Sequence, residues 1–244
     1  MIKTIFMFTY ICISVIFLLP FGFIGFMFYL IGLRKSMRFV IYKIAQGWAF
    51  SIMALIGSKI SVSGNENIPK KGGVCFVSNH SGYFDIILLL AFSKRPFGFV
   101  AKKELLLLPF INFWIYMLGG LFIDRRNVRK ALKTIGKGVK QIQAGGGMVI
   151  FPEGTRSRGR GLLPFHQGSL KLATKAEAII IPVAIEGSYE LFEKTYRIVS
   201  APIKITFLEG IDTAALSNEE RKVALSDRIH AAIKGVLDKD NSLT

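Results

Sequence analysis

The N-terminal part of the chain is continuously apolar, whereas the remainder alternates between short apolar runs and mixed segments. No charged residue lies between Ile5 and Leu33. This run exceeds the roughly 20 residues that a helix needs to cross the hydrocarbon core of a bilayer. Pro20 and the glycines that follow it interrupt the run and favour a bend. A second apolar stretch covers residues 44–56, so the pattern predicts a pair of membrane-associated helices within residues 1–60.

Three arrangements compete for this segment. A cleaved signal peptide is disfavoured because the apolar run is too long and lacks a clear small-residue cleavage site. A spanning helix followed by an amphipathic helix fits the pattern. A bent pair of helices that dips into a single leaflet fits it equally well, because Pro20 and the nearby glycines allow a bend.

After Gly64 the pattern of apolar and polar residues changes, and segments typical of strands alternate with segments typical of helices. Strands that alternate with helices predict an α/β fold with a largely parallel central sheet flanked by helices. We therefore expect one α/β domain over residues 61–244. The runs that read as strands cover residues 74–78, 98–101, 120–123, 148–151, 179–185 and 203–207. The helical patterns cover residues 84–92, 105–118, 128–143, 169–175 and 218–237.

The excess of basic over acidic residues indicates the kind of partner that the protein binds. The chain has 32 basic and 16 acidic residues and a net charge of +16, which suggests an anionic partner such as nucleic acid, an acidic membrane surface or a phosphorylated substrate. Nucleic acid is disfavoured, since no recognised motif is present and aromatic residues rarely interleave with Arg or Lys. Four basic residues separate the apolar stretches, and no acidic residue precedes Glu66, which favours the anionic cytoplasmic leaflet. These four are Arg34, Lys35, Arg38 and Lys43.

Candidate chemistry lies at the ends of predicted strands. His80 follows the strand at residues 74–78, and Asp85 lies five residues later. A histidine can take a proton from a hydroxyl when a carboxylate on its other ring nitrogen fixes the tautomer. Within one helix this spacing would place the two side chains on different faces. We therefore expect His80 in a turn that Gly82 permits, and Asp85 in the first turn of a helix.

Metal chemistry is not predicted. Cys12 and Cys75 are the only cysteines, and neither belongs to a CxxC or Cys/His cluster. The sequence therefore favours neither a metal site nor a disulfide framework.

Four segments in a fixed order carry a family resemblance. They are NHxxxxD at residues 79–85, GxxFIDR at 119–125, FPEGTRS at 151–157 and IPV at 181–183. The chain resembles the glycerolipid acyltransferase family over residues 60–210, and more narrowly its bacterial 1-acyl-sn-glycerol-3-phosphate acyltransferases. The AKKEL segment at residues 101–105 is also similar to that subfamily. One departure is His166, because the family commonly has lysine at this place in Phe-Lys-x-Gly.

The resemblance implies that a fatty acyl group passes from a thioester to the 2-hydroxyl of lysophosphatidic acid, forming phosphatidic acid. His80 would be the general base and Asp85 its orienting partner. The donor would be acyl-acyl carrier protein or acyl-CoA, with no other cofactor and no metal. No GxSxG motif is present, and the resemblance implies direct transfer without an acyl-enzyme. The apolar run, the basic cluster after it and the absence of acidic residues before Glu66 predict an inner-membrane protein whose acyltransferase domain, residues 61–244, faces the cytoplasm. The resemblance also leads us to prefer the single-leaflet arrangement slightly over the spanning helix.

The same resemblance implies a set of substrate-binding residues. Arg156 offers a planar fork that suits bidentate phosphate contact, and Arg125 and Lys102 are supporting cations. Glu153, followed by Gly154, can accept a hydrogen bond from the glycerol or hold Arg156 in place.

Two rival functions are kept. The acceptor can instead be glycerol-3-phosphate or another lyso-lipid. A non-enzymatic, basic membrane-binding protein also fits the charge, although the ordered motifs count against it. The activity of a His80→Ala variant separates the enzyme from the binding protein.

Overall fold

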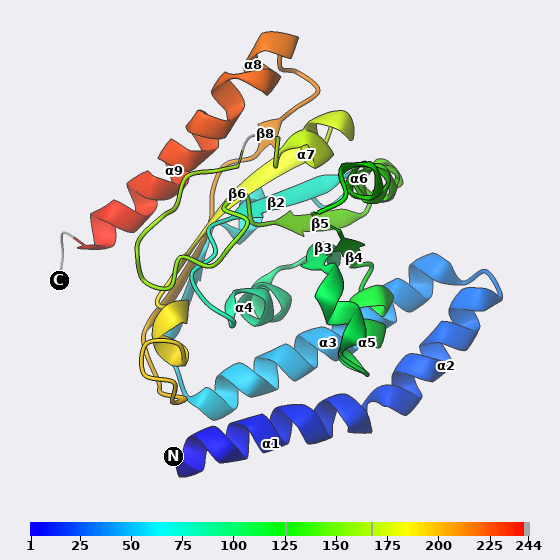
Figure 1. The fold of residues 1–244 in the computed structure, drawn as a ribbon, viewed down its shortest axis with the longest axis vertical. Helices are drawn as coiled ribbons and strands as arrows, with labels where there is room; N and C mark the ends of the chain where they lie inside the picture. Colours follow the sequence, from blue (N-terminus) through cyan, green and yellow to red (C-terminus); the bar gives the residue numbers. More distant parts are fainter. Residues whose placement is uncertain (125, 167, 242–244) are drawn as a thin grey trace.

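The computed structural model describes residues 1–124, 126–166 and 168–241, and it combines an N-terminal helical segment with an α/β domain (Figure 1). The helical segment contains α1 (Ile2–Phe17), α2 (Leu19–Leu30) and α3 (Arg34–Ile56). The chain bends at Leu18, and Pro20 lies in the first turn of α2, where its missing N–H costs no helical hydrogen bond. The stretches Ile2–Leu30 and Ser36–Ile56 are each long and apolar enough to cross a membrane.

Polar contacts join the first and third helices. The Tyr10 hydroxyl lies 2.6 Å from Ser51 Oγ, and Trp48 Nε1 donates to Ser14 Oγ at 2.8 Å. The outer surfaces of α1 and α2, in contrast, carry many exposed apolar side chains. Among them are Ile5, Phe6, Ile13, Ile16, Phe17, Phe21, Phe23, Ile24 and Leu30. An exposed apolar surface of this extent is characteristic of a membrane-associated segment.

The sheet of the α/β domain has eight strands, in the order β1-β7-β6-β2-β5-β3-β4, with β8 paired to β6. Neighbours run parallel except β6–β7 and β6–β8, so the prediction of a largely parallel sheet is confirmed. Strands β1 and β8 were not predicted. The bounds are β1 Ile60–Ser63, β2 Val74–Ser78, β3 Phe97–Lys102, β4 Leu121–Ile123, β5 Gly147–Ile150, β6 Ile179–Glu186, β7 Ile203–Phe207 and β8 Ile211–Asp212.

Helices cover both faces of this sheet (Figure 1). The first four residues of β2 are apolar because both faces of the strand are buried. Val74 and Phe76 enter the core beneath α3 and α4, whereas Cys75 and Val77 enter the core beneath α6, α7 and α9. The bounds are α4 Asp85–Phe92, α5 Ile111–Met117, α6 Val128–Gln143, α7 Lys171–Lys175, α8 Asn218–Lys222 and α9 Ala224–Asn241. The short 3₁₀ helices are η1 Asn65–Asn67, η2 Lys103–Leu107 and η3 Ser188–Leu191.

Two predicted helices are divided. Residues 105–118 form part of η2 and the separate helix α5, because Pro109 interrupts the pattern and Phe110 has a positive φ of 65°. Residues 218–237 are divided at Val223 into α8 and α9.

Candidate active site

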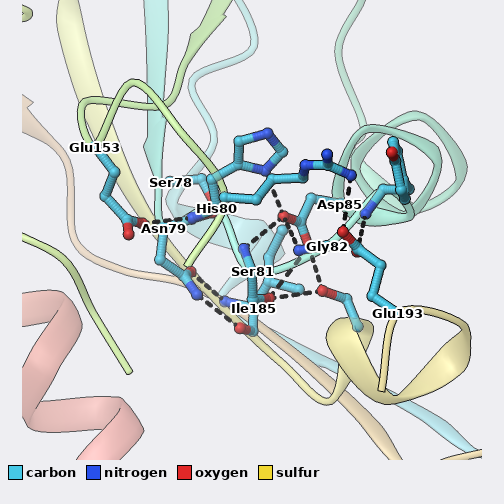
Figure 2. A network of polar contacts seen from close by, with 12 residues as sticks. Ser78, Asn79, His80, Ser81, Gly82, Asp85, Glu153, Ile185 and Glu193 are labelled. Carbon is cyan, nitrogen blue, oxygen red and sulfur yellow. Dashed lines mark hydrogen bonds and ion pairs between the residues drawn. The ribbon is translucent and has the colours of Figure 1, made fainter. Parts of the chain in front are cut away.

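The turn that follows β2 is held from two sides. The side chain of Asn79 accepts from Ile185 N and donates to Ile185 O, both at 2.8 Å, which ties the turn to β6 (Figure 2). The loop after β5 holds the backbone of His80: Ser157 N donates to His80 O at 2.7 Å, and Glu153 Oε1 accepts from His80 N at 2.6 Å. The backbone that carries the histidine is therefore fixed before any substrate binds.

His80 and Asp85 form the pair that their spacing predicts. His80 Nδ1 lies 2.6 Å from Asp85 Oδ2, and Asp85 is the first residue of α4 (Figure 2). The His80 ring stacks on Phe151 with 4.1 Å between centroids, and its side chain is 21% exposed. Among the residues that the structure describes, none forms a hydrogen bond with His80 Nε2. This nitrogen is therefore the one that can accept a proton.

Asp85 itself is fully buried and held by several donors. Its Oδ2 atom accepts from the backbone N–H groups of Ser81 at 2.8 Å and Gly82 at 3.0 Å. Its Oδ1 atom accepts from the hydroxyl of Ser188, a buried residue at the start of η3. A buried carboxylate with this many donors has one fixed orientation. Ser188 lies in no recognised motif, and no pattern in the sequence marks it as part of the site.

Glu153 stabilises the loop that follows β5. It is 2% exposed, and its second oxygen, Oε2, accepts from Leu163 N at 3.0 Å. Burial raises the pKa of the Glu153 carboxyl, and the hydrogen bonds from His80 and Leu163 oppose this shift. Gly154 continues the loop with φ +65°, a conformation that glycine adopts without steric cost.

Arg156 is paired with a different carboxylate from the one that its motif suggests. Its Nη1 atom lies 2.7 Å from Glu193 Oε1, so Glu193, and not Glu153, holds it. The guanidinium also lies over the ring of Tyr83 at 3.5 Å from the centroid. Glu193 Oε2 in turn accepts from Tyr83 N at 2.7 Å. The sequence offered no signal for Glu193, which lies beyond the last motif.

The remaining predicted cations are less closely tied to His80. Lys102 is exposed at the end of β3, and β5 separates β3 from β2. Its neighbour Lys103 contacts Asp124 Oδ2 at 2.9 Å, and this hydrogen bond lowers the pKa of the Asp124 carboxyl. Arg125 lies outside the described residues.

An apolar cavity of about 580 Å³ adjoins the site. Its walls come from α1, α3, α4, α5 and the neighbouring loops, so it lies where the N-terminal helices meet the α/β domain. Tyr83 and Phe84, in the turn between His80 and Asp85, form part of the lining. The other lining residues include Val15, Trp48, Ile87, Leu90, Trp114 and Leu118.

The other histidines play smaller parts in this arrangement. His166 is exposed, and its backbone N–H donates to Pro152 O at 2.9 Å. The His230 ring packs edge-on against Phe165 with 4.9 Å between centroids. Within the described part of the chain, no group of three or more His, Cys, Asp or Glu side chains is placed to hold a metal ion.

Comparison with known proteins gives consistent matches. The family model described as Acyltransferase matches residues 59–186. The 1-acyl-sn-glycerol-3-phosphate acyltransferase of Borreliella burgdorferi is 36% identical over 169 residues, which cover 69% of this chain and 68% of that protein. Its namesake in Escherichia coli is 32% identical over 68% of each chain, and that of Salmonella typhimurium is 36% identical over 55% of each.

A solved structure extends the likeness to nearly the whole chain. The crystal structure of the 1-acyl-sn-glycerophosphate (LPA) acyltransferase PlsC from Thermotoga maritima matches with a TM-score of 0.84 and 26% identity. The match covers 98% of this chain and 95% of that one, so it includes the N-terminal helices. On the strength of the family model and these relatives, the chain belongs to the acyltransferase family.

Proposed function

We propose that this protein is a 1-acylglycerol-3-phosphate O-acyltransferase, which transfers a fatty acyl group from a thioester to the 2-hydroxyl of lysophosphatidic acid. The names of its relatives support this reaction. The observation that carries the proposal is the arrangement around His80. An oriented histidine, a cation and an apolar cavity meet at one turn.

His80 is the general base in this proposal. Its Nε2 atom accepts the proton of the acceptor hydroxyl while that oxygen attacks the thioester carbonyl. The two events are concerted, because an alcohol is far too weak an acid for imidazole to ionise it first. Asp85 holds Nδ1 and stabilises the imidazolium. The tetrahedral intermediate then expels the thiolate, which takes the proton from His80, so the ester forms and the histidine is regenerated.

Arg156 binds the acceptor phosphate in this scheme. Its stack on Tyr83 and its bond to Glu193 leave further guanidinium N–H groups for a phosphate oxygen, and charge-assisted contacts of this kind are strong. Glu153 and Gly154 act by shaping the loop that carries Arg156, since both Glu153 oxygens accept from backbone amides. Lys102 and Arg125 are kept as supporting cations for the same phosphate.

The apolar cavity accommodates a fatty acyl chain. Its volume falls within the range of about 300–1,000 Å³ that ligand sites typically have. Because Tyr83 and Phe84 form part of its wall, a chain within it would end beside His80 and Asp85. The donor is the thioester of an acyl carrier protein or of CoA, and the chemistry that the chain's own residues perform needs no further cofactor.

Residues 1–60 anchor the enzyme in a single leaflet, with the catalytic domain, residues 61–244, on the cytoplasmic face of the inner membrane. Contacts along α1 support this arrangement: Ile198 N donates to Thr4 Oγ1 at 3.0 Å, and Trp114 Nε1 donates to Val15 O at 3.2 Å. Helix α2 also touches the domain, since a Cβ at Gly22 would lie 2.7 Å from Phe113. A helix that contacts the domain at both ends lies along it and does not run away from it across a bilayer.

A purified enzyme in detergent micelles tests the proposal. It would be given lysophosphatidic acid, glycerol-3-phosphate or lysophosphatidylglycerol, each with both donor types. We expect lysophosphatidic acid to give the highest kcat/KM. Faster acylation of another acceptor would assign a different substrate. If no acceptor were acylated, the result would favour the rival function, a non-enzymatic membrane-binding protein.

A further inference from the structure

The outward face of α6 carries a continuous row of basic side chains. Over Val128–Gln143 the helix contains five basic residues and no acidic one. Side chains three or four positions apart lie on one helical face, and the spacing of these five places them together. We call this row the α6 basic surface; it comprises Arg129, Lys130, Lys133, Lys137 and Lys140, all exposed.

The opposite face of α6 is firmly attached to the domain. Ile142 is fully buried, and a Cβ at Gly138 would lie 2.7 Å from Leu172 and 3.0 Å from Leu121. Asn127 caps the helix by accepting from Lys130 N at 3.0 Å. The basic surface is therefore presented on a fixed element rather than on a loop.

Like charges at these spacings destabilise a helix when nothing balances them. Arg129 and Lys133 lie four positions apart, as do Lys133 and Lys137. No ion pair joins any of the five to an acidic group within the described part of the chain. An acidic partner would offset the repulsion, which gives the row a physical reason to bind one.

The position of α6 favours a protein from the aqueous phase over the bilayer. Helices α6, α7 and α9 cover one face of the sheet, whereas α1, α3 and α4 lie on the other (Figure 1). The apolar anchor and the α6 basic surface therefore lie on opposite sides of the sheet. The row also spans about 16 Å at 1.5 Å per residue, a length that suits an acidic helix better than a single phosphate group.

The row begins at the edge of the sheet where the chemistry occurs. Helix α6 starts five residues after β4 ends, and β4 ends at the same edge as β2, from which His80 follows. Lys102, which is exposed at the end of β3, adds positive charge at that edge. We propose that the α6 basic surface docks an acidic carrier protein and thereby presents its acyl thioester to His80. This inference rests on the proposed function and assigns the delivery of its donor.

A donor comparison tests the docking surface. The same acyl chain would be supplied on a bacterial acyl carrier protein and on CoA, at low and high salt. The Lys133→Glu/Lys137→Glu variant should retain the helix, since Lys and Glu have similar helix propensities and Arg129 then faces an opposite charge. A matched control with the same change in net charge is Lys222→Glu/Lys234→Glu, which lies on α8 and α9.

We expect the α6 variant to raise KM for the carrier-protein thioester at least about ten-fold at low salt, because steering by complementary charge is lost. The difference should shrink at high salt. KM for the CoA thioester should stay within about two-fold, which also shows that the variant is folded, and the α8/α9 control should resemble the wild type with both donors.

Several outcomes would overturn the inference. An equal rise in KM for both donors would assign the surface to a general anionic contact. An unchanged carrier-protein KM with weaker sedimentation on phosphatidylglycerol vesicles would assign it to the membrane. A wild-type enzyme that uses only CoA would refute docking while leaving the proposed function intact, whereas turnover with neither donor would refute the proposed function itself.

Discussion

Glu193 forms a largely buried ion pair with Arg156, with 2.7 Å between Oε1 and Nη1 and only 5% exposure of the Glu193 side chain. The same carboxylate accepts from Tyr83 N, and the Tyr83 ring lies beneath the guanidinium. The cation that we assign to the acceptor phosphate is thus oriented before the substrate arrives. Orientation of this kind reduces the entropy that binding would otherwise cost.

Replacing Glu193 with glutamine should weaken acceptor binding. The amide keeps an acceptor for Tyr83 N but removes the charge that orients Arg156. The loss of a charge-assisted hydrogen bond, about 1.5–3 kcal/mol, corresponds to a rise in acceptor KM of about ten-fold or more. The matched control is Glu190→Gln, because Glu190 pairs with Lys194 at 2.9 Å in an exposed position and should change KM by less than about two-fold. Steady-state kinetics for both substrates measures the effect, and an unchanged acceptor KM would show that Glu193 has only a structural role.

Arg156→Ala should raise the acceptor KM by about ten-fold or more, because the phosphate loses its charge-assisted contact. Arg156→Lys keeps the charge but loses the planar fork and should recover only part of the loss. The donor KM should change little in either variant. If the donor KM alone rose, the phosphate assignment would be wrong.

Asp85→Asn should lower kcat by at least about 10²-fold, because an amide cannot hold His80 in the tautomer that accepts the substrate proton. Its amide nitrogen would also confront the N–H donors of Ser81 and Gly82. Ser188→Ala removes one donor to the same carboxylate and should reduce kcat less severely. Both variants are assayed with and without a strong chelator. If a chelator abolished the activity of the enzyme and zinc or magnesium restored it, Asp85 would have a metal-binding role in place of the orienting role.

The intact protein should stay in the membrane fraction at roughly 1 M salt and in carbonate, and should require detergent for release. Salt at this concentration screens exposed charges within about 3 Å, so it releases proteins bound by charge alone. Release by salt would refute an embedded anchor.

Cysteine labelling separates the two embedded arrangements. Cys12 is exposed, so Lys3→Cys is made in a Cys12→Ser background. Lys3 Nζ donates to Ile56 O at 2.7 Å, and Thr4 Oγ1 accepts from Ile198 N at 3.0 Å, which places the start of α1 beside the end of α3 and the α/β domain. The new thiol should therefore react with an impermeant reagent only from the cytoplasmic side. Reaction from the opposite side alone would establish a spanning helix.

Much of this fold and site could be predicted from local sequence patterns. The rest depends on packing between segments that are far apart in the sequence. The alternation of strands and helices and the His80–Asp85 turn could be predicted because each depends on residues close together in sequence. Strand β1 could not, because its four residues alternate between half-buried and exposed and it is defined by pairing with β7, some 140 residues later.

The same reason explains what was missed in the site. Ser188 and Glu193 are ordinary polar residues in sequence, and they become important only because the end of β6 brings them to the turn after β2. Glu153 shows the same limit. Its sequence left open whether it would contact the glycerol or hold Arg156, and in the structure its oxygens accept from His80 N and Leu163 N while Glu193 holds Arg156.

The most direct test of the account is the turnover of purified His80→Ala with lysophosphatidic acid and an acyl thioester. The variant lacks the only base that the proposed reaction uses, so kcat should fall by at least about 10²-fold. The thermal midpoint should change little, because the ring is partly exposed and the backbone of the turn is held by Ser157 and Glu153. Near-normal turnover by a folded His80→Ala enzyme would contradict the mechanism.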